Sequence, residues 1–411
     1  MAAATPGGHD DDTRPHDHDH DDDHVPRSHD HDDDYTAAMA TERRRFAVDH
    51  SGSPLDHVGA YSIDPAALPG NVENFIGVAQ VPVGLAGPLL VDGEHATGEF
   101  YVPLATTEGT LVASYNRGMR MLRACGGVTT TVVDDRMQRA PAFTFADARA
   151  ARRFGEWVEQ HHDEITAVAE ATTRVGRLRG ITQVPVGPLR YLRFDYTSGD
   201  AAGQNMTGKA TLAACEWILD RYPEPAQLLL SGNIDTDKKH SQINTLLTRG
   251  KRVVAEAVIR REPLLDLMGV DTQVLFRARQ ISHVGAFMAG AASNGSHAAN
   301  ALAALFIATG QDAANVAESQ AAITYTQMLD NGDYYWSITL PSLIVATYGG
   351  GTGLPTQREC LELLGCYGPG KVRTFAEICA AVVLAGEISL GAAVLHGDWV
   401  ASHDTFGRNR P

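Results

Sequence analysis

The stretch Thr374–His396, TFAEICAAVVLAGEISLGAAVLH, decides the fold class of this chain. It is long, apolar and rich in Ala and Gly, which is typical of a helix that packs closely against its neighbours on every side. Glu387 interrupts its apolar part, Ile378–Leu395, so we expect a buried core helix and no membrane span. The chain is therefore predicted to form a large helix-rich domain around one long central helix.

The rest of the C-terminal half continues this pattern. From Ser231 onward the chain is helix-rich, and three further segments have helical spacing: Ser296–Ala308, Ala313–Gln320 and Thr356–Leu364.

Residues 142–230 have a different pattern, in which strands and helices alternate. Predicted strands lie at Phe143–Phe145, Gln183–Val186 and Tyr191–Tyr196, and predicted helices at Ala148–Glu170 and Lys209–Arg221. This pattern favours a small sheet with helices on one face, and therefore an α+β protein. We expect four regions: a tail over 1–35, a helical segment over 36–70, a large domain formed by 71–141 and 231–411, and a small domain, 142–230, inserted into it.

The N-terminal region contains a polar tail and a short folded segment. Residues 9–34 contain seven His and twelve Asp with almost no apolar residue, so this segment cannot offset the entropy cost of ordering and is predicted to be disordered. Metal capture by its closely spaced imidazoles is the alternative interpretation. A short helix is expected at Ala37–Val48, and Val72–Leu90, with its Gly and Pro residues, is expected to form short strands joined by tight turns.

Composition excludes several classes of protein. Residues 1–35 hold twelve Asp against two Arg, so most of the formal net charge of −16 lies in the tail and the body is only mildly acidic. A nucleic-acid partner is therefore not expected. Five Cys without a C-x-x-C pair argue against a disulfide scaffold, and no apolar leader follows the N-terminus, so we expect a cytoplasmic protein that has no membrane segment.

Three short polar stretches carry the candidate chemistry. They are Thr106–Ser114 (TTEGTLVAS), Ser231–Lys239 (SGNIDTDKK) and Gly310–Asn315 (GQDAAN), and each places an ionisable residue at the end of an expected element. Together they suggest one site with an acid, a lysine and an aspartate. Thr106 or Thr107 is expected to cap a helix that contains Glu108 in its first turn.

Each stretch also has an ordinary structural explanation. Asp237, Lys238 and Lys239 could be solvated surface charges, and Asp312 could simply cap the following helix. The functional alternative for Asp312 is to tune the pKa of a lysine. His403 by itself has the pattern of a surface residue.

A partial phosphate-binding motif follows the predicted strand at Tyr191–Tyr196. Gly203–Lys209 matches G-x-x-x-x-G-K, but Ala210 stands where a P-loop has the Ser or Thr that binds magnesium. An NTPase is therefore the weaker interpretation, although Gly199, Gly203 and the amides before a helix would favour a phosphate group. A dinucleotide site of the G-x-G-x-x-G type has no support, because that pattern is absent from the sequence.

Taken in order, the motifs resemble those of the hydroxymethylglutaryl-CoA (HMG-CoA) reductase family, class I. The resemblance runs from about Ser53 to Arg408 and includes ENFIGVAQVPVGLAGPL, TTEGTLVASYNRG, SGDAAGQNM, SGNIDTDKK, HAANALAALFIATGQDAAN, YGGGTGLPTQ and LAGEISL followed by SH. It implies a large domain around a central helix with an inserted ferredoxin-like domain that binds NADP(H). It also implies a four-electron reduction of an acyl-CoA thioester to an alcohol by two NADPH, in a homodimer or larger homo-oligomer in which ENFIG and TDKK segments of different subunits complete one site.

The resemblance also implies roles for individual residues. The catalytic set would be Glu108, Lys238, Asp312 and His403, with Lys238 stabilising an oxyanion, His403 protonating the CoA thiolate, Glu108 donating a proton and Asp312 tuning the other two. Substrate binding would fall to Arg139, Ser231, Asp237, Lys239, His297 and Asn300. NADPH binding would fall to Asp200, Gly203, Gln204, Asn205, Met206 and Arg174, the last at the 2′-phosphate. No metal is expected among these residues.

One segment departs from the family pattern. The chain has RQISHVGA where the family has NKNLVGS, so Ile281 stands in the place of a lysine and His283 in the place of a leucine. A reductase of the same family acting on a different acyl thioester is therefore an alternative, and a non-catalytic phosphate- or nucleotide-binding protein on the same fold is a second one.

Overall fold

A computed structural model describes residues 25–28 and 33–396 of the chain. The chain divides after Gln80 into two compact units, which we describe separately. Most of the predicted tail and His403 lie outside the described residues.

The N-terminal unit contains one α-helix, α1 (Ala37–Ser51), between two short 3-10 turns, η1 (Asp33–Tyr35) and η2 (Pro65–Ala67). Thr36 caps α1 by accepting a hydrogen bond from the amide of Met39, and Gly52 ends it in the left-handed conformation. The fully buried Arg43 donates to the carbonyl groups of Pro26 and Asp34 and forms an ion pair with the Asp34 carboxylate. The predicted helix is thus confirmed, and ordered structure begins before Thr36.

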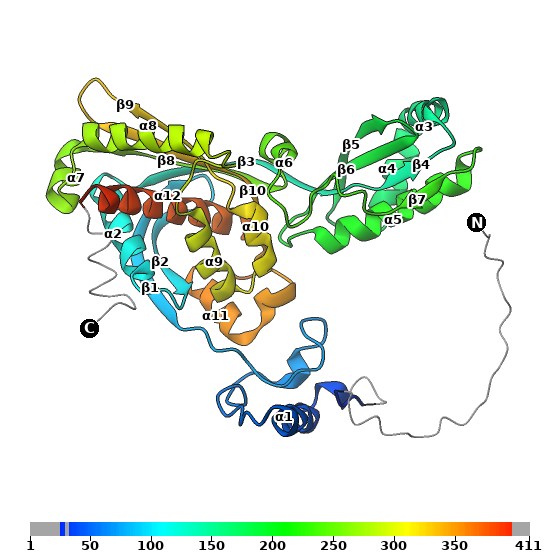
Figure 1. Cartoon of the computed structure of the whole chain (residues 1–411), viewed down its shortest axis with the longest axis horizontal. Helices are drawn as coiled ribbons and strands as arrows, with labels where there is room; N and C mark the ends of the chain where they lie inside the picture. The colour runs from blue at the N-terminus through cyan, green and yellow to red at the C-terminus, as the bar shows by residue number, and fades with distance from the viewer. Residues whose placement is uncertain (1–24, 29–32, 397–411) are drawn as a thin grey trace. The chain divides into compact units, whose positions relative to one another are not determined.

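The larger unit combines ten strands with eleven α-helices in the described part of the chain (Figure 1). The strands are β1 (Val83–Gly93), β2 (Thr97–Ala105), β3 (Val128–Arg139), β4 (Ala142–Thr144), β5 (Arg177–Val186), β6 (Leu189–Thr197), β7 (Gln227–Leu229), β8 (Gly250–Ile259), β9 (Ile323–Met328) and β10 (Tyr334–Leu343). The helices are α2 (Leu111–Ala124), α3 (Ala148–Gln160), α4 (His162–Glu170), α5 (Gln204–Arg221), α6 (Gln242–Leu247), α7 (Arg261–Met268), α8 (Thr272–Met288), α9 (Ala298–Thr309), α10 (Val316–Ser319), α11 (Pro355–Leu363) and α12 (Val372–His396). Two 3-10 turns, η3 (Ala313–Asn315) and η4 (Gly350–Gly353), complete it.

One long strand, β3, connects two parts of this unit. Its first residues pair in parallel with β1, its middle pairs with β8, and Met137–Arg139 pair with β6. The sheet order β7-β4-β6-β3-β8-β10-β9 therefore runs continuously from the smaller part to the larger one, as Figure 1 shows. This continuity fixes the end of β3, and with it Arg139, at the junction of the two parts.

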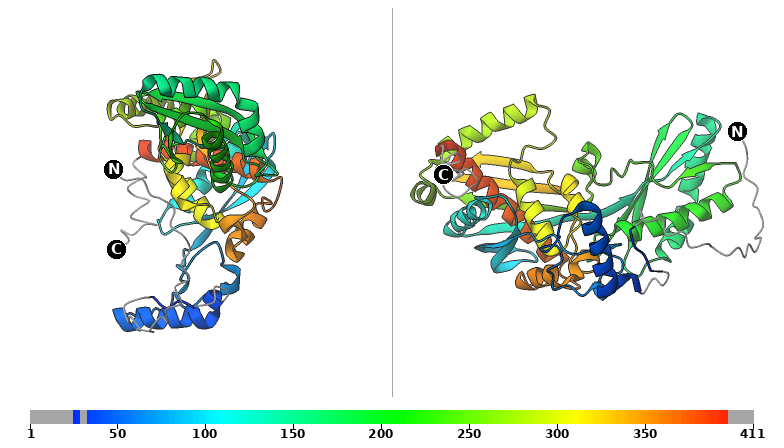
Figure 2. Two further views of the ribbon diagram at one scale, coloured as in Figure 1. Left: turned by 90° about the vertical axis from the view of Figure 1, so that its right-hand side faces the viewer. Right: turned by 60° about the horizontal axis from the view of Figure 1, so that its bottom comes forward.

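Helix α12 is buried in the larger core. It contacts α2, α8, α9 and strands β1, β3, β8 and β10, and the second view in Figure 2 shows it running alongside strands of the sheet. The span Val372–Leu395 is long and apolar enough to cross a membrane, but 78% of its most apolar 18-residue window is buried inside the fold, which is typical of a core helix. The one charge in its apolar middle, Glu387, is paired with the buried Arg279 at 3.0 Å.

A second core lies around β4 and β6. Buried residues of α3, α4 and α5 pack against Phe143, Leu192, Phe194 and Tyr196 of this sheet. The three helices share one core with the strands, which agrees with the predicted α+β class. The predicted division into residues 142–230 and the remainder stays a prediction.

Several predicted elements differ from the observed ones. The helix predicted at Ala148–Glu170 is two helices that meet at His161, and the strands expected before Val83 are absent from the described residues 72–82. The region after Ser231 contains strands β8, β9 and β10 as well as helices. In β8, alternate residues from Lys251 to Ile259 are buried, the period of two that is typical of a strand with one face on the core.

Candidate active site

The loop 231–239 between β7 and α6 has an unusual backbone. Asn233, Thr236 and Lys238 adopt positive φ angles of 65°, 51° and 55°, which residues other than glycine rarely adopt. Such strain persists only where surrounding contacts enforce it, and it is concentrated at functional sites. The loop is therefore held in a defined shape.

The loop presents Lys238 to Asp312. The Lys238 Nζ lies 2.8 Å from Asp312 Oδ2, and both side chains are about half exposed, at 44% and 41%. The hydrogen bond to Asp312 raises the pKa of Lys238, so its ammonium form is favoured. Asp312 Oδ1 accepts a hydrogen bond from the amide of Ala314 and caps η3. Asp312 is therefore both a helix cap and the partner of a lysine.

Arg249 stabilises this loop through hydrogen bonds. Its guanidinium is fully buried and donates to Glu318 at 3.0 Å, to the carbonyl group of Gln138 at 3.0 Å and to Asp237 at 2.6 Å. Glu318 in turn accepts the backbone amide of Lys238 at 3.1 Å. Burial would raise the pKa of Asp237, but Arg249 and Gln204 outweigh it, so the pKa lies below its ordinary value.

A cleft of about 570 Å³ opens beside the Lys238–Asp312 pair. Its wall includes Gly203 and the first residues of α5, Gln204, Asn205 and Met206. Gln204 Nε2 donates to Asp237 at 2.9 Å and to Asn315 at 3.1 Å, so α5 is tied to the loop of Lys238. The opposite wall is the glycine-rich segment Gly349–Thr352.

The P-loop interpretation is wrong in its geometry. Helix α5 begins at Gln204, so Gly208 and Lys209 lie inside a helix and cannot wrap around a phosphate as a loop. Gly203, with φ of 90°, precedes the helix, and its position tolerates no side chain because a Cβ would lie 2.5 Å from Ser198 Cβ. The first amides of α5 have no side-chain cap and remain available to an anion.

The other predicted substrate residues lie at or beside this loop. Arg139 lines the cleft and contacts Asp235 at 3.3 Å, while its buried Nε has no partner in the described part of the chain. Ser231 and Lys239 are exposed, and Lys239 Nζ donates to the carbonyl group of Asp237 at 3.0 Å.

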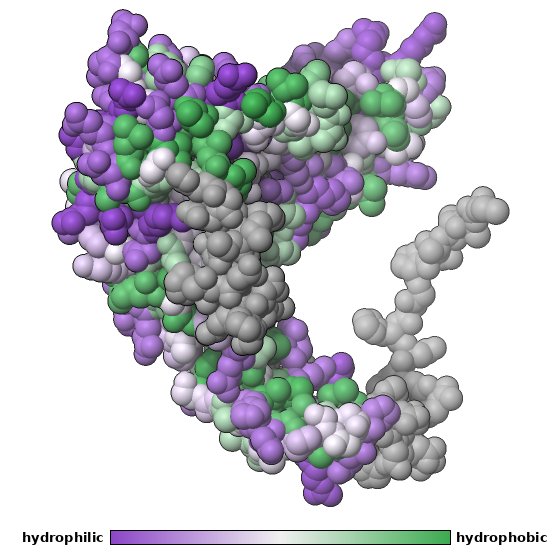
Figure 3. Space-filling model, turned by 60° about the vertical axis from the view of Figure 1, so that its left-hand side comes forward, coloured by the Kyte–Doolittle hydropathy of each residue, from purple (hydrophilic) through white to green (hydrophobic). Residues whose placement is uncertain are grey.

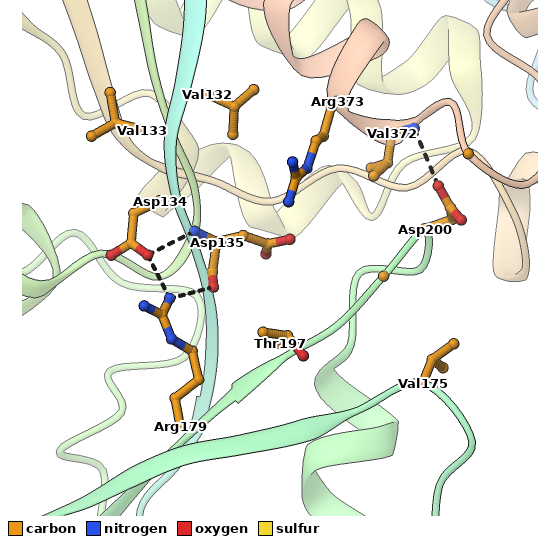
Figure 4. Close-up of a pocket in the computed structure, with 12 residues that line it drawn as sticks. Val132, Val133, Asp134, Asp135, Val175, Arg179, Thr197, Asp200, Val372 and Arg373 are labelled. Atoms are coloured by element: carbon orange, nitrogen blue, oxygen red, sulfur yellow. Dashed lines mark hydrogen bonds and ion pairs between the residues drawn. The ribbon is translucent and has the colours of Figure 1, made fainter. Parts of the chain in front are cut away.

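Asp200 lies at a second cavity, of about 560 Å³. Figure 4 shows Asp200 on one side, bonded to the amide of Val372, and Asp134, Asp135 and Arg179 grouped on the other side. Arg174 is exposed in the turn before β5 and lines neither cavity, although its neighbour Val175 lines the second one.

Besides Ser231, Lys239, Asp200 and Arg174, three more predicted residues in the described part of the chain do not line the cleft. Glu108 is exposed in the loop before α2, while His297 and Asn300 lie at the start of α9. His297 stacks on Tyr115 at 4.8 Å, its amide donates to Glu387, and burial lowers its pKa to about 4. The predicted cap of α2 is wrong, because Thr110 precedes the helix and the Thr106 hydroxyl instead accepts the amide of Glu108 two residues on.

Sequence reasoning missed Arg249 and Glu318. Neither residue belongs to a sequence motif that indicates a functional site. Asn315 falls inside the GQDAAN stretch, but only the fold reveals its contact with Gln204.

Comparison with known proteins defines the family. Residues 39–408 match the family model described as hydroxymethylglutaryl-coenzyme A reductase, and the chain belongs to this family. The 3-hydroxy-3-methylglutaryl-coenzyme A reductase of Pyrococcus horikoshii is 45% identical, with 90% of this chain and 92% of the relative covered. That of Methanocaldococcus jannaschii is 41% identical, with 91% and 94% covered.

A solved structure shares the fold. The class II reductase from Streptococcus pneumoniae, determined with bound NADPH in open conformations, superposes with a TM-score of 0.65 over 80% of this chain and 88% of that protein. Its sequence identity is 20%, so this likeness concerns the fold alone.

Proposed function

We propose that this chain is an NADPH-dependent HMG-CoA reductase that converts HMG-CoA to mevalonate. The observation that carries the proposal is the Lys238–Asp312 pair, 2.8 Å apart at the edge of the cleft, in a chain of this family. The reaction places negative charge on a thioester oxygen, and a fixed ammonium group is the side chain that stabilises such charge.

The cleft fits a dinucleotide phosphate cofactor. The uncapped amides of α5 are donors for anionic groups, and Gly203 lets the backbone approach them closely. NADPH supplies the hydrides when bound. Gly203, Gln204, Asn205 and Met206 would hold it at the cleft, with Asp200 nearby and Arg174 reaching its 2′-phosphate.

The polar residues of the loop divide the remaining work. Lys238, kept charged by Asp312, would hold the thioester oxygen. Asp237, whose pKa is lowered, accepts a hydrogen bond as a carboxylate and would take the substrate hydroxyl. Arg139, Ser231 and Lys239 would bind its free carboxylate.

Proton transfer is assigned to Glu108 and His403. Glu108 would donate a proton in the second reduction, and His403 would protonate the CoA thiolate. His297, whose imidazole is neutral because its pKa is about 4, would act with Asn300 through hydrogen bonds only.

We further propose that two copies complete each site. Glu108, His297 and Asn300 do not line the cleft of a single chain, and their counterparts from a second chain would complete it. Helix α8 exposes an apolar row, Val274, Ile281, Val284, Phe287 and Met288, with Phe287 85% exposed. On the face that Figure 3 shows, hydrophobic residues lie interspersed among hydrophilic ones. Light scattering tests this: Phe287→Asp should lower the mass of the oligomer, and a monomeric wild-type protein would contradict it.

Turnover tests the main proposal. Two NADPH should be oxidised for each mevalonate formed, and Lys238→Ala should lower kcat by about 100- to 1000-fold, as expected for the loss of one oxyanion donor. Absence of NADPH oxidation with any acyl-CoA would refute it. ATP hydrolysis that depends on Lys209 would instead support a nucleotide-binding protein.

A different acyl thioester is the second candidate. Ile281 is 67% exposed, and His283 forms a hydrogen bond with the Thr324 hydroxyl at 2.9 Å. Neither residue therefore provides the positive charge of the lysine that the family has in this segment. A panel of acyl-CoA substrates distinguishes the two, because a higher kcat/KM for an acyl group without the free carboxylate would favour the second candidate.

A further inference from the structure

The turn between β1 and β2 is fastened to the start of α12. Glu377 Oε2 accepts the amides of His95 and Ala96 at 2.9 and 2.7 Å, and the Thr374 hydroxyl donates to the carbonyl group of His95 at 3.1 Å. These hydrogen bonds from α12 hold the backbone of the turn in place independently of the exposed side chains of the turn.

The second oxygen of Glu377 has no partner. The residue is fully buried, and its Oε1 accepts no hydrogen bond within the described part of the chain. No Lys, Arg or His in those residues forms an ion pair with it. The neighbouring Thr130 Oγ1 is also buried without a partner. A buried carboxylate oxygen of this kind is costly unless a cation or a donor satisfies it.

Two further metal-ligating side chains meet Glu377 at this turn. A carboxylate oxygen of Glu94, a ring nitrogen of His95 and a carboxylate oxygen of Glu377 lie within 4.8 Å of one another. Glu94 is oriented by the Thr131 hydroxyl, which donates to its Oε2 at 2.9 Å. Outer contacts of this type orient the ligands of metal sites.

Gly93 leaves the space that these groups share. A Cβ at this position would lie 2.2 Å from Thr130 Oγ1 and 2.3 Å from Glu377 Oε2. Any side chain here would therefore fill the space between the Thr130 hydroxyl and the Glu377 carboxylate.

We propose that Glu94, His95 and Glu377 form a site for Zn²⁺. One imidazole nitrogen and two carboxylate oxygens are a donor set that zinc accepts, with water as the fourth ligand. Tetrahedral zinc with bonds of about 2.1 Å needs donors about 3.4 Å apart, so the three groups must approach each other slightly. Glu94 and His95 are exposed, which leaves room for this approach to the buried Glu377.

The ion would join the β1–β2 hairpin to α12. Strand β2 leads directly into the loop of Glu108, and α12 begins at Val372, beside Asp200. The zinc therefore acts as a structural clip away from the cleft that contains Lys238, because none of its three ligands lines that cleft.

The experiment measures the zinc-dependent rise in Tm of the full chain. The His-rich tail can also bind zinc, so the comparison is between His95→Gln and a matched control, His162→Gln, whose imidazole lies 3.6 Å from the single carboxylate of Asp163. An ion that binds only the folded state raises Tm by mass action. Zn²⁺ should raise the Tm of the wild type and of His162→Gln but not that of His95→Gln.

A second variant protects the test against misfolding. Glu94→Gln changes an exposed side chain and should leave the fold intact, yet it should weaken zinc binding at least about 10-fold in competition with a chromophoric chelator. An equal rise in Tm for wild type and His95→Gln, or no rise in the wild type, would overturn the proposal.

Discussion

Replacing Arg249 by Met should destabilise the larger unit strongly. The guanidinium is fully buried, and the change removes its hydrogen bonds to Glu318, Gln138 and Asp237 while the volume is nearly kept. Glu318, whose side chain is 1% exposed, would lose its counter-ion in the interior. Breaking a buried pair on one side costs about 3–5 kcal/mol, because a charge is left buried without compensation.

This cost converts into a shift of the unfolding temperature. The unit that contains Arg249 has roughly 330 residues, for which the entropy of unfolding is about 0.7 kcal/mol/K. The expected fall in Tm is therefore about 4–7 °C, measured by calorimetry at pH 8, above the pKa of about 7 of Glu318, so that its carboxylate is ionised. The same variant should lower kcat, since Glu318 also holds the amide of Lys238.

Two further variants isolate the cause. Arg261→Met removes a surface pair with Asp271 at 2.8 Å and should cost no more than about 1 kcal/mol. Adding Glu318→Gln to Arg249→Met removes the uncompensated charge and should recover part of the lost Tm. If Arg249→Met unfolds within 1 °C of the wild type, or if the double variant is the least stable of all, the buried pair does not have the role described.

Three other predictions concern pH and packing. Burial raises the pKa of Glu318 to about 7, so the folded state keeps a proton that the unfolded chain releases. The free energy of unfolding of the wild type should therefore fall by up to about 3 kcal/mol between pH 4.5 and 7, whereas that of Glu318→Gln should not. Equal pH dependence of the two proteins in urea unfolding would contradict this. Gly118→Ala places a Cβ 1.9 Å from the carbonyl oxygen of Ala385 and should cost about 1–3 kcal/mol or more, whereas Gly180→Ala, with nothing within 4 Å, should be nearly neutral in the same melts. Burial lowers the pKa of His297 to about 4, so stability falls as pH drops from 6.5 towards 4, and its imidazole signals in NMR should not titrate between pH 6 and 8; a midpoint near 6.5 would refute its burial.

Local pattern was sufficient for most helices. The expected helix at Thr374–His396 is observed as Val372–His396, and that at Thr356–Leu364 as Pro355–Leu363. Apolar residues that recur with a period near 3.6 indicate a helix from the local sequence alone. Helix ends were less predictable. Helix α5 begins at Gln204, five residues before the predicted start, since its first turn is stabilised by contacts of Gln204 with Asp237 and Asn315.

The candidate site was predictable only in part. Lys238 and Asp312 are 74 positions apart, and motif resemblance paired them before the fold placed them 2.8 Å apart. The same motifs gave no sign that Glu108 would lie outside the cleft of a single chain. Distance in space depends on how β3 connects the two parts of the sheet, which no local window contains.

By itself, the sequence determined the family, the α+β class and the long C-terminal helix, and it named several of the residues that line the cleft, Lys238 and Asp312 among them. These follow from periodicity and from motifs, which are local properties of the chain. Tertiary structure alone decided that Arg249 and Glu318 support the loop of Lys238, that the Gly203–Lys209 segment is helical, and that Glu94, His95 and Glu377 meet at one turn. The physical reason is that buried charges and unpaired oxygens acquire their partners, and therefore their roles, only when distant segments pack together.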